Sequence, residues 1–385
     1  MLRKVGNLME LPLKGIRVLS LTRLLPGAYC SRLLADLGAE VILLEHPGGG
    51  DPMRLRPSFF AAMNRNKKSI TVDLKTEKGK EICYRLAQHS EVFIEGFRPG
   101  VAARLAVDYE RIQALNPRIV YSSISGFGQD GPYRLLPGHD LVYEGIAGML
   151  SYKVARESSD AVEPLVPTGD LSSAMFAVIS ILAALYDLKK SETGSYLDIS
   201  MTDGLVSWMS IWLSSDEALG PWPQSAGYGV YQTQDGRHLV LGVVEEQHFW
   251  RNLCRVVSRE DLGELSVQDR SQRYGELDAT LKNVFLTRSR DEWLKRLREA
   301  DVPAGPAYTR VSEVVNDPHL LYRRMVKNPS GSESSPQIGS PLPFSRGINR
   351  GNERVPALGE HNREILLTLG YDMETIEQLK RHGVI

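Results

Sequence analysis

The chain is poor in cysteine, with three in 385 residues. Cys30, Cys83 and Cys254 are odd in number, far apart and outside any C-x-x-C spacing, which argues against a disulfide framework and a structural zinc site. No apolar segment follows the first basic residues, and the longest strongly apolar run, near residues 174–186, is too short to span a bilayer. We therefore expect a reduced, cytoplasmic protein with no metal site and no membrane partner.

An excess of either charge is also missing. The 46 lysines and arginines nearly balance the 47 aspartates and glutamates, so no global field favours nucleic acid or an anionic membrane as partner. Any site for an anion must be local. At 42% hydrophobic composition, a chain of this length can bury a large core and has room for two domains.

The start of the chain predicts a βαβ unit. The pattern is typical of a buried strand over Gly15–Leu21, a helix over Gly27–Leu37 and a second strand over Glu40–Glu45. The turn after the first strand, TRLLPGAY, lacks the glycines that a dinucleotide-binding turn requires. This absence makes a nicotinamide dehydrogenase a weak alternative.

A literal G-x-G-x-x-G does occur later, at Gly126, Gly128 and Gly131. Pro132 and Pro137 follow it closely, so no helix of useful length can present its N-terminus to a pyrophosphate there. We interpret this match as chance.

Prolines and glycines become frequent soon after residue 215, where we place a domain boundary. Beyond it, two short strands flanking Asp235-Gly236 predict a β-hairpin, and a charged helical stretch follows to about residue 299. Pro303, Gly305 and Pro306 predict a loop, and a Ser/Pro/Gly-rich connection begins at Pro329. The expected domains are therefore residues 1–215, 216–328 and a C-terminal return over 329–385.

Basic residues are concentrated in the first quarter of the chain. Such runs usually form solvated faces. Two of them, however, lie where strands are expected to begin or end: RNKKSITVDLK spans Arg65 to Lys75, and EGFRPG holds Arg98 in a Pro-Gly turn. Strand ends that present cations would suit a phosphate-rich ligand.

Asp170 lies immediately before a helix that the spacing predicts to be buried along most of its girth, from Leu171 onward. A helix N-cap is the ordinary role of an acid in this position. The small residues around it, Thr168-Gly169 before and Ser172-Ser173 after, leave space beside the carboxylate. Both a capping role and a chemical role therefore stay open.

His139 follows a Pro-Gly turn, and Asp140 is expected to cap the short helix that follows. A single histidine is more often structural, but its near-neutral pKa also makes it a candidate for proton transfer.

Taken together, these segments resemble family III CoA-transferases (the CaiB/BaiF type), a family that also includes the α-methylacyl-CoA racemases. The resemblance covers almost the whole chain. It rests on the order and spacing of LPGAYCSRLLADLGAEVILLE, NRNKKSITVDLK, EGFRPG, GFGQDGPY, the Asp170 stretch through ETGSYLDISMTDG, YQTQDGR and LGEHNREILLTLGY.

The resemblance implies an α/β enzyme with a large Rossmann-like, CoA-binding domain built on a parallel sheet from both ends of the chain, and a smaller inserted α+β domain. It implies an interlocked homodimer with the active site between subunits. An acyl-CoA thioester and a small carboxylic acid would be substrates, with no permanently bound cofactor. The residues that would contact CoA are Lys75, Arg98, Gly138, Asp140 and Tyr143, together with Arg65 of the basic segment.

By the same resemblance, Asp170 is the catalytic aspartate. In the transferases it attacks the thioester to form a mixed anhydride; in the racemases it works with a histidine, here His139, on opposite faces of the α-carbon. The racemases also carry a glutamate in the small domain. Counting forward from Asp235-Gly236 selects Glu245 for this role, and counting back from Phe249-Trp250 selects Glu246. Racemases also follow the aspartate with a glycine-rich turn, whereas this chain has Leu171 and two serines.

We therefore expect transfer of CoA between an acyl-CoA and a carboxylic acid through Asp170, with 2-methylacyl-CoA racemisation or epimerisation by His139 and Asp170 as the alternative. An acyl-CoA-binding paralogue without activity is a further alternative, because fold alone never guarantees activity.

Overall fold

The computed structural model describes residues 11–150, 166–214, 225–327, 336–342 and 354–385. The chain divides into two compact units, a large one of residues 1–219 with 329–385 and a small one of residues 220–328. The small unit lies within the sequence of the large one, so the chain leaves the large unit once and returns to it.

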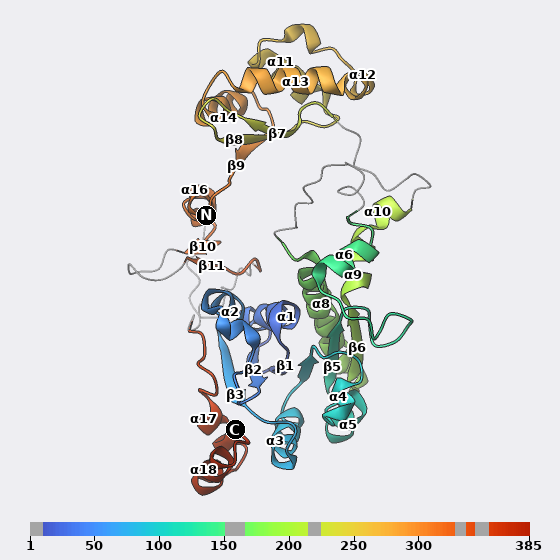
Figure 1. Ribbon diagram of the computed structural model, residues 1–385, viewed down its shortest axis with the longest axis vertical. Coiled ribbons are helices and arrows are strands. Elements are labelled where there is room, and N and C mark those ends of the chain that lie inside the picture. The colour runs from blue at the N-terminus through green and yellow to red at the C-terminus, as the bar shows by residue number, and fades with distance from the viewer. Residues whose placement is uncertain (1–10, 151–165, 215–224, 328–335, 343–353) are drawn as a thin grey trace. The chain divides into compact units, whose positions relative to one another are not determined.

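The large unit is built on a sheet of six parallel strands in the order β3-β2-β1-β4-β5-β6 (Figure 1). The strands are β1 (Arg17–Leu21), β2 (Glu40–Glu45), β3 (Lys67–Thr71), β4 (Val92–Glu95), β5 (Val120–Ser125) and β6 (Ser195–Ser200). This is the strand order of a doubly wound Rossmann-type sheet, in which the winding direction reverses between β1 and β4. The expected parallel α/β architecture is confirmed.

Helices connect the strands and cover the sheet. They are α1 (Leu24–Asp36), η1 (Pro52–Leu55), α2 (Pro57–Asn64), α3 (Glu77–Gln88), α4 (Val101–Arg104), α5 (Tyr109–Leu115), α6 (Asp140–Ile146), α8 (Thr168–Ser191), α9 (Met201–Trp208), α10 (Ser210–Leu213), α17 (Asn362–Thr368) and α18 (Met373–Arg381), with a short strand β11 (Gln337–Ile338).

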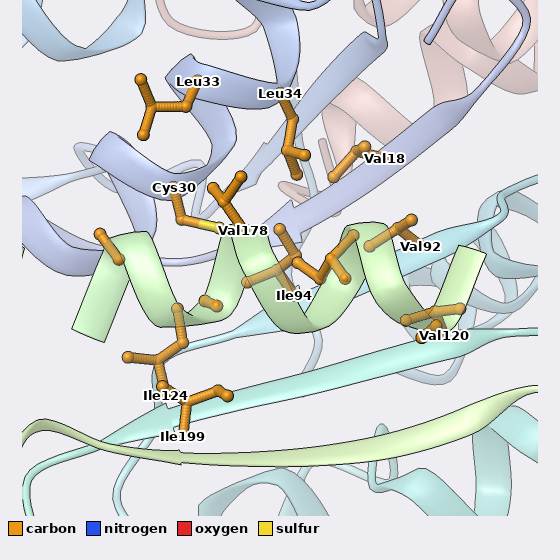
Figure 2. Packing of buried hydrophobic residues seen from close by; sticks show 14 of the residues in the cluster. Val18, Cys30, Leu33, Leu34, Val92, Ile94, Val120, Ile124, Val178 and Ile199 are labelled. Atoms are coloured by element: carbon orange, nitrogen blue, oxygen red, sulfur yellow. The ribbon is translucent and has the colours of Figure 1, made fainter. Parts of the chain in front are cut away.

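Alternation along the strands divides the core into two layers, as a sheet covered on both faces requires. Val18 of β1 and Ile94 of β4 face one cluster, which α1 and α8 complete through residues such as Leu34 and Val178 (Figure 2). The neighbouring strand residues, such as Leu19, face the other cluster, which α3, α5, α17 and α18 complete. The first cluster places α8 against the sheet.

Two helices are longer than the sequence predicts. Helix α1 starts at Leu24 and not at Gly27, because Pro26 is tolerated in a first turn whose N–H groups have no helical partners. Helix α8 has 24 residues, and by length and composition it is the one helix in the described ranges that could cross a membrane, with a mean hydropathy of 1.8 over a window of 18 residues. The expectation of a run too short to span is therefore wrong, although α8 packs on α1 and the sheet.

The glycines of the G-x-G-x-x-G match lie in the loop between β5 and α6, and no helix begins before Asp140 in this loop. Gly128 and Gly131 have positive φ, at 84° and 79°, so they serve loop turns. The interpretation of this match as chance agrees with the loop geometry.

The C-terminal return covers the edge of β3. Ser69 accepts a backbone bond from His361 N–H at 2.9 Å, and Asn362 exchanges two hydrogen bonds with Thr71, at 2.8 and 2.7 Å. These bonds pair an edge that would otherwise be open. Leu366 and Leu379 then join the second cluster, so the two ends of the large unit share one core.

The small unit contains an antiparallel sheet of β7 (Tyr228–Gln232), β8 (His238–Gly242) and β9 (Ala304–Ala307), in that order. The predicted hairpin around Asp235-Gly236 is confirmed, but the loop predicted at Pro303–Pro306 is wrong. Residues 304–307 form an edge strand, where Pro306 needs no N–H bond toward the open side.

Helices pack on this sheet around Trp250 and Phe285. The remaining elements of the small unit are α11 (Gln247–Val256), η2 (Glu260–Leu262), α12 (Val267–Gln272), α13 (Tyr274–Phe285), α14 (Arg290–Glu299), α15 (Val311–Val315), α16 (Pro318–Tyr322) and β10 (Val326–Lys327).

Candidate active site

Two adjoining pockets open at the carboxyl ends of the strands, where the winding of the sheet reverses. Doubly wound sheets bind ligands at this place. The larger of the two, the Asp170 pocket, has a volume of about 380 Å³ and is formed by the segments that follow β1, β4, β5 and β6, with parts of α6 and α8. The smaller, the Lys75 pocket, has a volume of about 120 Å³. They share Arg23 and Phe97.

A third pocket of about 770 Å³ lies at the opposite edge, where β1 and β2 begin. Its lining contains none of the residues that the sequence singled out. Volume alone therefore does not identify the site, and we take the carboxyl edge as the candidate.

Asp170 does not cap α8, contrary to one interpretation of the sequence. The helix begins two residues earlier, at Thr168, so Asp170 lies inside its first turn. Asp140 takes the capping role: its Oδ1 accepts from the backbone N–H groups of Gly169 at 2.7 Å and Asp170 at 3.2 Å. A tertiary contact thus satisfies the free donors of the helix and leaves the side chain of Asp170 available.

Asp140 was expected to cap α6, and this prediction is also wrong. Asp140 is the first residue of α6, the N-cap is His139, and no side chain caps that end. Gly169 makes the actual contact possible, because a Cβ at this position would lie 2.9 Å from Asp140 Oδ1.

Burial and the negative charge of Asp140 raise the pKa of Asp170 to about 7. Burial disfavours the charged carboxylate, and a second carboxylate close by adds repulsion. The pKa of Asp140 is also raised, mainly by burial, and the two backbone N–H bonds oppose that shift. Glu144, which is buried beneath, accepts a hydrogen bond from Thr168 Oγ1. Three carboxylates therefore meet at the start of α8.

His139 lines the same pocket as Asp170 and is exposed. The loop before it is held by Tyr143, whose hydroxyl donates to the carbonyl of Gly138 at 2.6 Å. The ring of Tyr143 packs edge-on against Phe127 at 5.1 Å, and a Cβ on Gly126 or Gly138 would meet this ring at 2.5 or 2.6 Å. Tyr143 and Gly138 thus set the course of the chain that presents His139.

Arg98 lines the Asp170 pocket, in the turn that follows β4. Its guanidinium donates to the Leu135 carbonyl, and Glu95 supports the turn by accepting from Phe97 N–H at 2.6 Å. Lys75 lines the other pocket. The two pockets together therefore carry cations from the segments that follow β3 and β4.

Arg65 lines neither pocket. Its guanidinium lies 3.2 Å from the carboxylate of Asp36 and donates to the Ile338 carbonyl. These contacts tie the C-terminal return to α1.

Sequence reasoning did not single out several residues that line or support the Asp170 pocket. Arg23 follows β1 directly, and Arg134 lies in the loop before α6. A search for cations after each predicted strand would have found Arg23. Nothing in the local pattern distinguishes Glu144 from an exposed helical acid.

Glu245 and Glu246 belong to the small unit. Both are exposed, in the loop between β8 and α11, and Glu246 occupies the N-cap position of α11. Across the described ranges, no three His, Cys, Asp or Glu side chains are grouped so that they could hold a metal ion.

Comparison with known proteins agrees with this geometry. A model of CoA-transferase family III matches residues 13–362. A succinyl-CoA--D-citramalate CoA-transferase of Chloroflexus aurantiacus is 33% identical, covering 96% of this chain and 98% of that protein. An alpha-methylacyl-CoA racemase of Homo sapiens is 31% identical, covering 97% of each. The crystal structure of a CAIB/BAIF family protein from Brucella suis superposes with a TM-score of 0.83 at 29% identity, covering 94% and 100%. The chain therefore belongs to CoA-transferase family III.

Proposed function

We propose that the protein transfers CoA between an acyl-CoA and a carboxylic acid, with Asp170 as the nucleophile. One observation carries the proposal: Asp170 lines a pocket at the reversal point of the sheet with its side chain not used in capping, and its pKa is raised to about 7. A basic carboxylate in a partly desolvated pocket is suited to attack a thioester.

The proposed exchange proceeds in balanced steps. A carboxylate oxygen of Asp170 attacks the thioester carbonyl carbon, the C–S bond breaks, and CoA leaves as thiolate with a mixed anhydride remaining. The acceptor carboxylate attacks the Asp170 carbonyl carbon and releases the first acid. The thiolate then attacks the acyl carbon of the new anhydride, which forms the product thioester and regenerates the Asp170 carboxylate. No proton is transferred, so the exchange needs no general base.

CoA enters as a substrate across the two pockets. We place its phosphate-bearing end toward Lys75 and its thioester end toward Asp170, because the pockets adjoin at Arg23 and Phe97. Arg98, Gly138, Asp140 and Tyr143 are the proposed contacts near the thioester. A contact between Arg65 and CoA would require its guanidinium to exchange its present partners, the Ile338 carbonyl and Asp36, for the ligand.

The names of the relatives suggest which substrates to test first. Relatives named for succinyl-CoA transfer to glutarate, in Mus musculus and Homo sapiens, are 31% identical to this chain. Arg23, Arg98 and Arg134 line the pocket of Asp170, which favours anionic acids. We therefore propose succinyl-CoA as the first donor to assay.

Racemisation of a 2-methylacyl-CoA is the second candidate. The observation in its favour is that His139 and Asp170 line one pocket, as two bases acting on one α-carbon must. The third group of that reaction would be Glu245 or Glu246.

We also propose a cytoplasmic homodimer. Within the large unit, α8 exposes an apolar stripe of Met175 (45% exposed), Ile179 (58%) and Tyr186 (65%). An apolar stripe on a core helix is typical of a protein interface, and a second copy is the partner that the interlocked dimers of the family suggest. The cysteines are free and buried, which suits a reducing compartment.

Replacing Asp170 with Asn should lower kcat for CoA transfer by about 10³-fold or more, because the amide is not a nucleophile. Hydroxylamine added during turnover should convert Asp170 of the wild type to a hydroxamate, detected by peptide mass spectrometry, but not the variant. Asp187→Asn, an exposed acid on the same helix, is the control. Full transfer activity in Asp170→Asn would contradict the mechanism.

Transfer should lose activity on the acid side. Because the raised pKa leaves Asp170 increasingly protonated below about pH 7, kcat/KM should fall about tenfold per pH unit there. Glu95 also has a pKa raised to about 7 by burial. Asp140→Asn shows which of the two groups causes the loss of activity. It removes the charge that helps to raise the pKa of Asp170, so a loss caused by Asp170 should move to lower pH. A fall in kcat/KM that begins only near about pH 4, the ordinary range of aspartate, would show that the pKa of Asp170 is not raised in solution.

His139→Ala separates the two reactions. In a transferase the variant should keep kcat within about threefold, since the exchange moves no proton. In a racemase it should abolish α-proton exchange of (R)-2-methylacyl-CoA in D₂O, followed by proton NMR. His382→Ala, an exposed histidine near the C-terminus, controls for the substitution itself. Wild-type α-proton exchange without added acid, lost in His139→Ala, would favour the second candidate.

Ile179→Glu should shift the protein from dimer to monomer in sedimentation velocity, because it buries a charge in the proposed interface. Turnover should fall with it if the site forms between subunits. Lys189→Glu, an exposed residue of the same helix, should leave the dimer intact. A dimer that persists in Ile179→Glu would place the interface elsewhere.

A further inference from the structure

Arg270 of α12 is a buried cation in the small unit with few partners. Its side chain is 0% exposed, and its guanidinium lies over the ring of Trp250, 5.0 Å from the centroid. Its Nη2 donates to the backbone carbonyl of Glu245 at 3.4 Å. The other two guanidinium nitrogens of Arg270, Nε and Nη1, have no hydrogen-bond partner in the part of the chain that the structure describes.

A second buried arginine in the same unit shows the ordinary arrangement. Arg290 forms an ion pair with Glu313 at 3.0 Å, so most of the cost of burying its charge is offset. Arg270 has no ion pair within 4 Å among the described residues, and the hydrogen bond from its Nη2 goes to the loop before α11. A buried charge that is kept without a pair is expected to serve a purpose other than stability.

The loop that Arg270 contacts is otherwise held at its two ends. Val243 N–H donates to Gly227 O at 3.0 Å, and Trp250 N–H donates to Glu246 O at 3.2 Å. Between them, the Glu245 carbonyl accepts from Arg270, and the Glu246 carboxylate accepts from backbone N–H groups of the loop itself, those of Val244, Glu245 and Glu246. The Trp250 ring in turn is fixed, because its Nε1–H donates to the Leu262 carbonyl at 2.7 Å.

We propose that Arg270 is a positioning residue, which holds the loop of residues 243–247 so that the carboxylates of Glu245 and Glu246 are presented in one arrangement. This inference rests on the second candidate of the proposed function, racemisation, only in giving one of those carboxylates a role in turnover. The planar guanidinium suits the task, since stacking on Trp250 fixes its direction while its fork faces the loop.

The electrostatics agree with this arrangement. Burial lowers the pKa of Arg270, and the negative charge of Glu246 acts against that shift. The carboxylate of Glu246 is therefore within electrostatic range of the guanidinium, although the described residues show no ion pair between them.

Arg270→Met tests the proposal through a property that does not depend on activity. Amide hydrogen exchange, followed by mass spectrometry of the full chain, should accelerate about tenfold or more in peptides covering residues 243–247. Arg290→Met is the matched control: it removes another buried guanidinium of the same unit and should change exchange near Glu313 instead. Arg270→Lys keeps one donor and should restore part of the protection.

The kinetics of α-proton exchange in a 2-methylacyl-CoA supply the second measurement. Arg270→Met should lower kcat for this reaction about tenfold or more with KM for the acyl-CoA changed by less than about threefold, the pattern of a group acting in the transition state. Local loosening together with this loss of kcat would support the proposal. Exchange that is unchanged, or raised evenly throughout residues 225–327, would overturn it, as would local loosening with full kcat.

If the wild type exchanges no α-proton, the racemisation candidate fails, while the amide hydrogen-exchange experiment still decides whether Arg270 holds the loop.

Discussion

The site depends on one contact, the hydrogen bonds from the first turn of α8 to the carboxylate of Asp140. They satisfy backbone donors at the start of the helix, and so the side chain of Asp170 is not used in capping. The same contact brings a second negative charge close, which together with burial raises the pKa of Asp170 to about 7. Gly169 permits the approach, since a side chain there would collide with Asp140.

The sheet explains why this contact lies at a pocket. Because β1 and β4 are neighbours and their following segments depart in opposite directions, the carboxyl edge cannot close between them. Helix α8 is held against one face of the sheet by Val178 and its neighbours (Figure 2), and its N-terminus is thereby presented at this edge. The core that stabilises the large unit also positions the carboxylate that we propose as the nucleophile.

The strands could be predicted closely, since the bounds of β2 in the structure, Glu40–Glu45, are those expected from the sequence. Asp170 and His139 could also be found, and the structure brings both to one pocket. What local patterns could not show is which group satisfies a helix end, because Asp140 lies 30 residues from Asp170 in sequence. For the same reason the edge strand at Pro306 was missed: its pairing with β8 is a tertiary contact that overrides the turn preference of Pro and Gly.

The raised pKa also bears on why an enzyme aspartate would react where a free acid does not. A free carboxylic acid of ordinary pKa is a weak nucleophile toward a thioester and is present only at its solution concentration. Asp170, with a pKa of about 7, is more basic and hence more nucleophilic, and the pocket supplies proximity. The greater basicity also makes its carboxylate a poorer leaving group than an ordinary acid. In the proposed anhydride, attack by the acceptor carboxylate at the Asp170 carbonyl therefore expels the substrate acid, which exchanges one acid for another. The closing step has to expel the Asp170 carboxylate from the acyl carbon, and there the attacking group is the CoA thiolate, a stronger nucleophile than a carboxylate.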